Sequence, residues 1–435
     1  MKFFVFLLFN VLINSLFGQT TLTKREAVED IYHYFDTIKF YHPNMYWHTP
    51  KSVVDSCIED MIGKCYDSMP VYQLCYLLAR AQGLWDDHTG LNGRWYKGVN
   101  TERVFPKIYF KDHKIYLEDN DLEIITINSV PVDSILDYLK MNYGADVSMR
   151  WLESMICINY DFQGSVSDCG IYPPYKVAGK TKENRDTLVI LDGIDIEILL
   201  EEENIFAREW NDPYPYHFEL YPEEKIAIIR YNEVFRMSDY PEVDSLLGNF
   251  FQGCHKNNIR HLFFDVSRNE GGYTRHFTMF LPYIAMDKKK SYRRTIIEPN
   301  NEFTEILELK SIFPEGTKGV KFFKKNIYIY QSFYSQSATP DFCACMKVLT
   351  NAVLVGTETG SGLPLYATSK PHYLPNSGIR FNVSNYYWKD EFPKLPRTKE
   401  GFLLPDIEYP WSVEHRLNIE DCKKIIKLKS NLKSK

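Results

Sequence analysis

The segment Asn326–Gly362 constrains the fold of this chain more than any other stretch. Its apolar, aromatic run at Ile327–Tyr330 predicts a buried strand. Apolar residues then recur at helical spacing over Ala338–Leu349, which predicts a helix, and Ala352–Val355 predicts the next strand. Strand, sharp turn, helix and strand make a βαβ unit, which is typical of an α/β core.

Ser337 stands at the turn between that strand and that helix. The N–H groups at a helix start point at whatever lies above them, and the helix dipole favours negative charge there. The position suits a nucleophile, because the same N–H groups can hold an oxyanion. A serine at a helix start is also a common cap, so its type alone leaves both roles open. Ser332 and Ser335 are rival nucleophiles that precede the helix start.

A second stretch, Ile259–Gly272, pairs a strand with a glycine-rich turn. Its strand, His261–Val266, carries Asp265 near its end, and the turn closes with Gly271 and Gly272. Paired glycines allow positive φ and close backbone approach, so such a loop can donate N–H groups to a substrate oxygen. A tight turn without a ligand is the alternative.

Together the two stretches resemble the C-terminal-processing (tail-specific) serine peptidases. That family shows Asp-x-Arg-x-Asn-x-Gly-Gly after a strand, Ser-Ala-Ser/Thr at a strand-to-helix turn, Val-Gly-Glu-x-Thr-x-Gly-x-Gly, and a closing Pro-Asp-Ile. The matching segments here are Asp265–Gly272, Ser337–Thr339, Val355–Gly362 and Pro405–Ile407, in that order. The resemblance implies a ClpP/crotonase-like α/β catalytic core.

The serine of such an enzyme needs a general base. One branch of the family supplies a Lys inside a Gly-Lys-Gly turn, where this chain has Ser361 between two glycines. The other branch, similar to the tricorn core peptidase, uses a His, which matches His88 in Asp87-His88-Thr89. The resemblance therefore implies Ser337 as nucleophile and His88 as base, a task that suits histidine near neutral pH. A hydrogen-bonded structural histidine is the alternative.

The same branch completes a relay with a Ser before the His and a Glu late in the core. Asp87 takes the Ser position, and Glu400 corresponds to the Glu, with Glu358 as the other candidate. The family places its two oxyanion-hole N–H groups at positions that match Gly272 and Ala338. The resemblance implies no metal and no organic cofactor.

Patterns along the rest of the chain predict further domains around this core. Helical spacing runs from a capped start at Thr23 to Gly90, and short alternating strands begin at Val104. The run Ile124–Val132 resembles a PDZ domain. We expect the following division: signal peptide 1–18, helical domain 19–100, PDZ-like β-rich region 101–215, α/β core 216–420, and a basic tail 421–435 that frays. We also expect strands 187–191 and 194–200 to pair as a hairpin.

The N-terminal run Met1–Gly18 has one Lys, an apolar stretch and then small residues, which predicts a secretory signal peptide. The mature protein would begin near Gln19, outside the cytoplasm, without stable membrane insertion. The net charge of −6 gives no reason to expect nucleic acid as a partner. The nine cysteines have no zinc-like spacing, which predicts no structural metal, and their odd number leaves at least one unpaired.

These observations predict an exported serine peptidase that acts on peptides or proteins through an acyl-enzyme on Ser337. The alternative is a non-catalytic peptide- or ligand-binding protein on the same scaffold. Substrate preference and oligomeric state stay open.

Overall fold

The computed structural model describes residues 21–91, 103–158, 161–198, 214–273, 276–284, 292–299, 301–307, 323–390, 395–412 and 415–432. The chain divides into two compact units, each assembled from three separate segments. Unit 1 comprises Met1–Ala145, Met155–Leu199 and Thr368–Tyr386; unit 2 comprises Asp146–Ser154, Leu200–Ala367 and Tyr387–Lys435. The signal peptide predicted for Met1–Gly18 lies outside the described residues.

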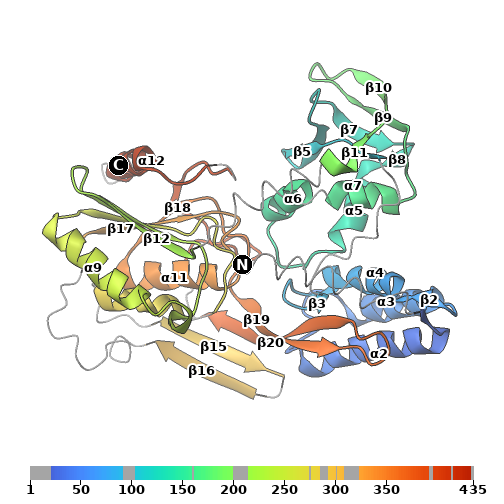
Figure 1. The fold of residues 1–435 in the computed structure, drawn as a ribbon, viewed down its shortest axis with the longest axis horizontal. Coiled ribbons are helices and arrows are strands. Elements are labelled where there is room, and N and C mark those ends of the chain that lie inside the picture. Colours follow the sequence, from blue (N-terminus) through green and yellow to red (C-terminus); the bar gives the residue numbers. More distant parts are fainter. Residues whose placement is uncertain are drawn as a thin grey trace. The chain divides into compact units, whose positions relative to one another are not determined.

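The first part of unit 1 is helical, as the sequence predicts (Figure 1). Its elements are α2 (Lys24–Tyr41), α3 (Lys51–Gly63), α4 (Val71–Ala79) and the 3-10 turn η1 (Gln82–Leu84). The predicted cap is present: the Thr23 hydroxyl accepts the Glu26 N–H at 3.2 Å, and the Glu26 carboxylate accepts the Thr23 N–H at 2.8 Å. Strands β1 (Thr21–Leu22) and β2 (Met69–Pro70) pair antiparallel.

A hairpin from late in the chain completes this helical part. It is formed by β19 (Leu365–Tyr373) and β20 (Arg380–Asp390). The buried core of the helices includes four hairpin residues: Leu374, Ile379, Phe381 and Val383. Within unit 1, β20 also pairs with β3 (Gly90–Leu91). The expectation that all of 216–420 belongs to the α/β core is wrong for residues 368–386, because an apolar pattern shows that a strand is buried but not against which element.

One buried carboxylate fastens the hairpin tip. Asp30 of α2 accepts the backbone N–H groups of Asn376 and Ser377 at 2.9 and 2.8 Å. Its side chain is fully buried, and burial of a carboxylate is tolerated when such hydrogen bonds replace water.

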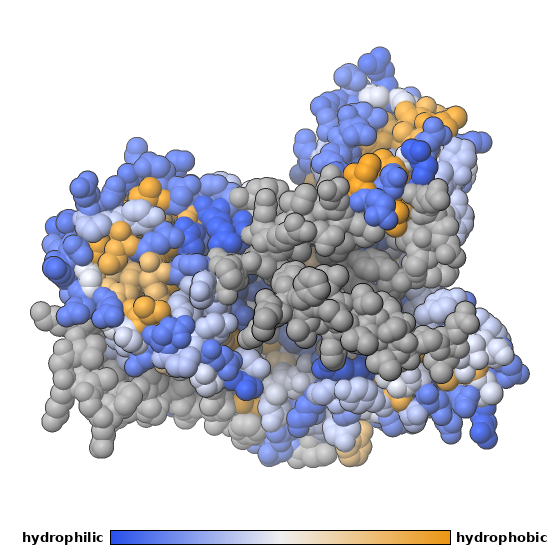
Figure 2. All heavy atoms as spheres, in the orientation of Figure 1, coloured by the Kyte–Doolittle hydropathy of each residue, from blue (hydrophilic) through white to orange (hydrophobic). Residues whose placement is uncertain are grey.

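The middle part of unit 1 is the β-rich region that the sequence predicts. An antiparallel sheet has the order β10-β9-β7-β6-β5, with β8 paired to β7. Its strands are β5 (Ile108–Lys111), β6 (Lys114–Leu117), β7 (Glu123–Ile127), β8 (Val130–Pro131), β9 (Tyr175–Lys180) and β10 (Asp186–Leu191). Helices α5 (Val132–Lys140) and α7 (Asp161–Asp168) accompany it, and α6 (Met149–Ile158) belongs to unit 2 up to Ser154 and to unit 1 from Met155. Figure 2 shows apolar surface here, where Leu188 and Ile190 are exposed.

The predicted hairpin of 187–191 with 194–200 is wrong. Strand β10 pairs along its whole length with β9, and β11 (Ile194–Asp195) pairs with β4 (Arg103–Val104). The Asp192-Gly193 turn signal is present, but it leads the chain from one sheet to another.

Unit 2 contains the predicted α/β core around a six-stranded sheet of order β12-β13-β14-β17-β18-β21. The strands are β12 (Tyr216–Tyr221), β13 (Ile226–Tyr231), β14 (His261–Asp265), β17 (Asn326–Gln331), β18 (Val353–Gly356) and β21 (Ile407–Glu408). All neighbours are parallel except β12 and β13, which are antiparallel. The parallel strands are buried on both faces, which explains their almost continuous apolar sequence.

Helices cover both faces of this sheet (Figure 1). Helices α9 (Val243–Lys256) and α11 (Ala338–Thr350) lie on one face, and α12 (Ile419–Leu432) lies on the other. The expectation of a frayed basic tail is wrong, because Cys422 and Ile425 of α12 are fully buried in a cluster with Ile228 and Phe263. Lys423, Lys424 and Lys427 occupy the exposed side of this amphipathic helix.

A second sheet in unit 2 anchors the start of α11. Strand β15 (Tyr292–Glu298) pairs with β16 (Asn301–Leu307) and with the last residues of β20. Arg294 on β15 forms a buried ion pair with Asp341 of α11 at 3.0 Å. The guanidinium also lies over the Trp388 ring, 4.2 Å from its centroid.

The sequence predicts at least one unpaired cysteine and no stable membrane insertion. All nine cysteines lie in the described residues, and each is a free thiol. Among the described helices, none has the length and apolar character that a membrane crossing requires.

The packing of α12 makes a testable prediction. Ile425→Ala should lower the free energy of unfolding of unit 2 by about 2–5 kcal/mol, because it deletes a fully buried side chain. Lys424→Ala, an exposed neighbour on the same helix, should change it by less than about 0.5 kcal/mol. Urea unfolding followed by tryptophan fluorescence measures both. Equal effects of the two substitutions would contradict the docking of α12.

Candidate active site

The turn between β17 and α11 holds Ser337 in an uncommon backbone conformation. Its φ is 52° and its ψ is −112°, at the N-cap position of α11. Side chains disfavour positive φ, and such strain persists only where the surroundings enforce it. One restraint is direct, because the Ser337 N–H donates to the Ser361 hydroxyl at 2.7 Å.

The two rival serines of this turn are buried and engaged. The Ser332 hydroxyl donates to the Ser267 carbonyl at 2.5 Å, and the Ser335 hydroxyl donates to the Val266 carbonyl at 2.8 Å. Both side chains have no exposed surface, whereas Ser337 is partly exposed. Of the three serines, Ser337 is therefore the one that a substrate in solution can reach.

The paired glycines pack directly against this turn. Gly271 has φ 103° and Gly272 has φ 129°. A Cβ on Gly271 would lie 2.6 Å from the Ser337 Cβ, and a Cβ on Gly272 would lie 2.4 Å from the Val234 carbonyl oxygen. Only glycine fits both places. Within the described part of the chain, neither the Gly272 nor the Ala338 N–H donates a hydrogen bond, so both remain available as donors.

A buried amide joins the glycine loop to α11. The Asn269 Oδ1 accepts the Gly271 N–H at 2.9 Å and the Thr339 hydroxyl at 2.7 Å. Its Nδ2 donates to the Tyr231 carbonyl at 2.8 Å, and its own carbonyl accepts the Gln336 N–H at 3.0 Å. The loop, the end of β13 and the first turn of α11 are thus held by one residue.

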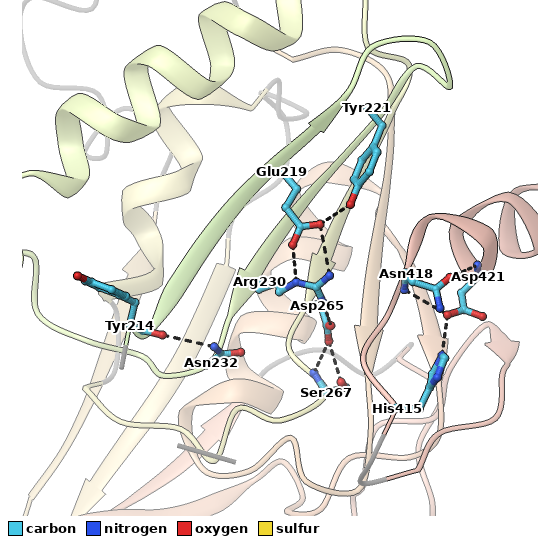
Figure 3. Close-up of polar contacts among 10 residues, drawn as sticks. All are labelled: Tyr214, Glu219, Tyr221, Arg230, Asn232, Asp265, Ser267, His415, Asn418 and Asp421. Atoms are coloured by element: carbon cyan, nitrogen blue, oxygen red, sulfur yellow. Dashed lines mark hydrogen bonds and ion pairs between the residues drawn. The ribbon is translucent and has the colours of Figure 1, made fainter. Parts of the chain in front are cut away.

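The loop begins from a charged network at the end of β14 (Figure 3). Arg230 lies between two carboxylates, with Nε 2.6 Å from Glu219 and Nη1 3.2 Å from Asp265. The Asp265 Oδ1 then accepts both the N–H and the hydroxyl of Ser267, at 3.1 and 2.7 Å. Asp265 therefore holds the chain in place where it leaves β14.

A third loop, Glu358–Gly362, lies against the serine turn. The Gly360 N–H donates to the Ser335 carbonyl at 3.0 Å, and a Cβ on Gly360 would lie 1.9 Å from the Phe333 carbonyl oxygen. Glu358 pairs with Arg150 at 3.1 Å. The position where one family branch has its Lys thus contributes a hydroxyl, that of Ser361, to the backbone of Ser337.

His88 lies in unit 1, in a turn closed by the Thr89 N–H, which donates to the Asp86 carbonyl at 3.1 Å. The Asp86 Oδ1 accepts the His88 N–H at 3.0 Å, which is the hydrogen bond of an Asx-turn. The same oxygen lies 3.9 Å from His88 Nδ1. The side chain of His88 is 26% exposed, so it is accessible from solvent.

Asp86 is the centre of a buried cluster that our interpretation of the sequence missed. Its Oδ2 accepts from His42 Nε2 at 2.9 Å, and its Oδ1 accepts from the Ser384 hydroxyl at 2.7 Å. Because His42 Nδ1 accepts the Asn44 N–H at 3.0 Å, the proton of His42 lies on Nε2. The signal for Asp86 in the sequence is its place two residues before His88, which is the spacing of an Asx-turn.

The protonation of Asp86 follows from these contacts. Burial raises the pKa of Asp86, but the hydrogen bond from His42, the nearby His42 and His88 rings and the hydrogen bond from Ser384 lower it by more. The net pKa of Asp86 therefore lies below the usual value, and the carboxylate is ionised at neutral pH.

The structure places the two remaining predicted residues as follows. Asp87, in unit 1, accepts the Gly144 N–H at 3.4 Å. Glu400, in unit 2, is fully exposed, and hydrogen bonds from its own backbone and from Thr398 lower the pKa of its carboxyl. Unit 2 thus brings Ser337 together with Gly272 and Ala338, while His88 and Asp87 belong to unit 1. No group of three or more potential metal ligands is arranged for a metal ion within the described ranges.

We compared the sequence and the structure of this chain with those of known proteins. Residues 225–402 match the sequence model of Peptidase family S41. No curated protein matches the chain. Mature CPAF complexed with lactacystin is similar in structure, with a TM-score of 0.53 and 12% identity, over 94% of this chain and 98% of that chain. Mature CPAF gives a TM-score of 0.52 and 13% identity, over 93% and 96%.

The photosystem II D1 C-terminal processing protease gives a TM-score of 0.44 at 11% identity, over 91% of this chain and 96% of that chain. At such identities the CPAF structures show likeness of fold alone. The matched residues contain the serine turn, the glycine loop and the Glu358–Gly362 loop described above. Residues 225–402 thus carry a Peptidase family S41 domain, and this domain supports a serine-type peptidase.

Proposed function

We propose that Ser337 is the nucleophile of this peptidase. Its accessibility, its strained backbone and its position at a helix start support this role, because they present the hydroxyl above backbone donors. The observation that carries the proposal is the packing of Gly271, where an added Cβ would lie 2.6 Å from the Ser337 Cβ and 3.0 Å from the Ala338 nitrogen. The Gly272 and Ala338 N–H groups would hold the oxyanion formed when the serine attacks a peptide carbonyl.

His88 is the proposed general base. It would take the proton of the serine hydroxyl and return it to the leaving amine, so that an acyl-enzyme forms and is then hydrolysed by water. Ser361 stands at the position of the Lys base of the other family branch and cannot replace it, since a hydroxyl is a poor base. His88 belongs to unit 1 and Ser337 to unit 2. The proposed mechanism requires the imidazole of the one to reach the hydroxyl of the other.

The substrate class and the site of action follow from the same proposal. Peptides or proteins are the substrates, and no cofactor takes part. Asp87 and Glu400 stay predictions as relay residues, with Glu358 as the alternative to Glu400. The apolar run Phe3–Leu16 supports export of the chain before it acts.

Ser337→Ala should abolish both peptidase activity and covalent labelling by a fluorophosphonate, which reacts with activated serines. The fold should survive, since a serine cap contributes only about 1 kcal/mol. Ser332→Ala and Ser335→Ala should keep the label, because neither hydroxyl is exposed. Mass spectrometry of the labelled peptide is the measurement. A label on another residue, or none on active parent protein, rules out Ser337.

His88→Ala should lower kcat by roughly 10³-fold, because an unassisted serine is a weak nucleophile. In the parent, kcat should rise with pH as the imidazole loses its proton, since only the neutral ring accepts one. A pH–rate profile of both proteins with one peptide substrate tests this. If the mutant keeps the profile of the parent, another group is the base.

Export makes an independent prediction. Protein purified from its native host should begin near Gln19, because the preceding run has the pattern of a cleaved signal peptide. Amino-terminal sequencing of that protein is the measurement, and recovery of Met1 argues against cleavage.

A further inference from the structure

The cluster around Asp86 contains a buried carboxylate that the proposed mechanism does not use. Asp86 and His42 have no exposed side-chain surface, and every hydrogen bond described above for the carboxylate comes from unit 1. A buried charge is costly unless it is paired and hydrogen-bonded. Asp86 lies next to His88 in two ways: it accepts the backbone N–H of His88, and it lies close to the imidazole ring.

Two distances define what Asp86 can do to His88. Its Oδ1 accepts the His88 N–H at 3.0 Å, which sets the backbone direction at the histidine. The same oxygen is 3.9 Å from His88 Nδ1, close enough for strong attraction to a protonated ring but too far for a hydrogen bond. A carboxylate so placed stabilises the imidazolium that forms when a histidine takes a proton from serine.

We propose that Asp86 is the positioning residue of His88, orienting the histidine through its backbone and favouring the protonated ring during catalysis. His42, at the end of α2, and Ser384, on β20, hold the carboxylate in place from two other elements. This inference rests on the proposed function, because it names the residue that orients His88, the general base proposed there. Asp87 is the alternative for that role, and the variants below distinguish the two residues.

The groups that face Asp86 come from each element packed against it. They are His42 from α2, His88 from the turn itself, Ser384 from β20 and Gln82 from η1, whose Nε2 donates to the Asp86 carbonyl at 3.5 Å and to the Thr89 carbonyl at 2.6 Å. The ionised state of Asp86 at neutral pH, noted above, supplies the negative charge that the inference needs.

Asp86→Asn keeps the size of the side chain and removes its charge. Removing the anion favours the neutral imidazole, so the acid limb of the kcat profile should shift to lower pH by about one unit. The plateau of kcat should fall by roughly 10²-fold with little change in KM, because the ring is less basic and less well oriented. A purely structural role could lower kcat but would leave the acid limb where it is.

Two variants make the comparison specific. Asp55→Asn removes an exposed charge from the helical part of unit 1 and should leave the profile unchanged. Asp87→Asn removes the neighbouring charge that the family relay would use. A shift of the acid limb in Asp86→Asn and none in Asp87→Asn supports the inference, and the reverse pattern overturns it in favour of Asp87.

Thermal melting shows whether Asp86→Asn is folded. If Asp86→Asn does not fold, Ser384→Ala and His42→Ala each remove one hydrogen bond to the carboxylate while keeping its charge. Both should lower kcat without moving the acid limb to lower pH by a full unit. Parental kcat in both folded variants overturns the inference.

A titration without substrate separates this inference from the proposed function. In Ser337→Ala, the NMR titration midpoint of His88 should fall when Asp86→Asn is added. A parent that shows no activity and no label refutes the proposed function, whatever the titration gives. An active parent whose His88 midpoint does not respond to Asp86→Asn refutes only the role of Asp86.

Discussion

The candidate site in unit 2 depends on the hydrogen bonds of one buried amide, that of Asn269. Its acceptor oxygen holds a backbone N–H of the glycine loop and a hydroxyl of α11, while its amide nitrogen holds the end of β13. Only a side chain with donor and acceptor on one planar group satisfies all three. An aspartate would lack the donor, and an apolar residue would leave three buried polar groups without partners, each costly.

That anchoring explains how Ser337 can remain in a strained conformation. Positive φ at a residue with a side chain costs free energy, which the surroundings must offset. Here Ser361 accepts the Ser337 N–H and Gly271 leaves no room for the turn to relax toward the loop. The three loops around the serine therefore act as one assembly, and each contributes backbone rather than side-chain chemistry to it.

Local patterns in the sequence were enough for the βαβ unit, the helical start at Thr23 and the alternating strands of the middle region. Each of these is decided by residues close together in the chain, through apolar spacing or capping. Contacts between distant residues were not predictable in this way. The hairpin 368–386 looks like a core strand pair, yet its apolar side chains complete a helical core that begins at residue 22. The lysines of α12 concealed an apolar face of fully buried residues.

The site shows the same limit. The motif around His88 drew attention to the adjacent Asp87, but the side chain that reaches the histidine is Asp86, because an Asx-turn joins residues two apart. The cluster partners His42 and Ser384 are 44 and 298 residues from Asp86 and carry no local signal.

The segmented construction of unit 1 has a consequence for the order of synthesis. Its helices are made first, but Leu374, Ile379, Phe381 and Val383, which close their apolar core, are made only near the end of the chain. Until then the growing chain exposes the apolar surface around Tyr34 and Trp85 that the hairpin later covers, and a nascent chain in that state is prone to aggregate. The helical part cannot mature as an independent N-terminal domain, and a chain truncated before residue 368 would lack the strands that complete it.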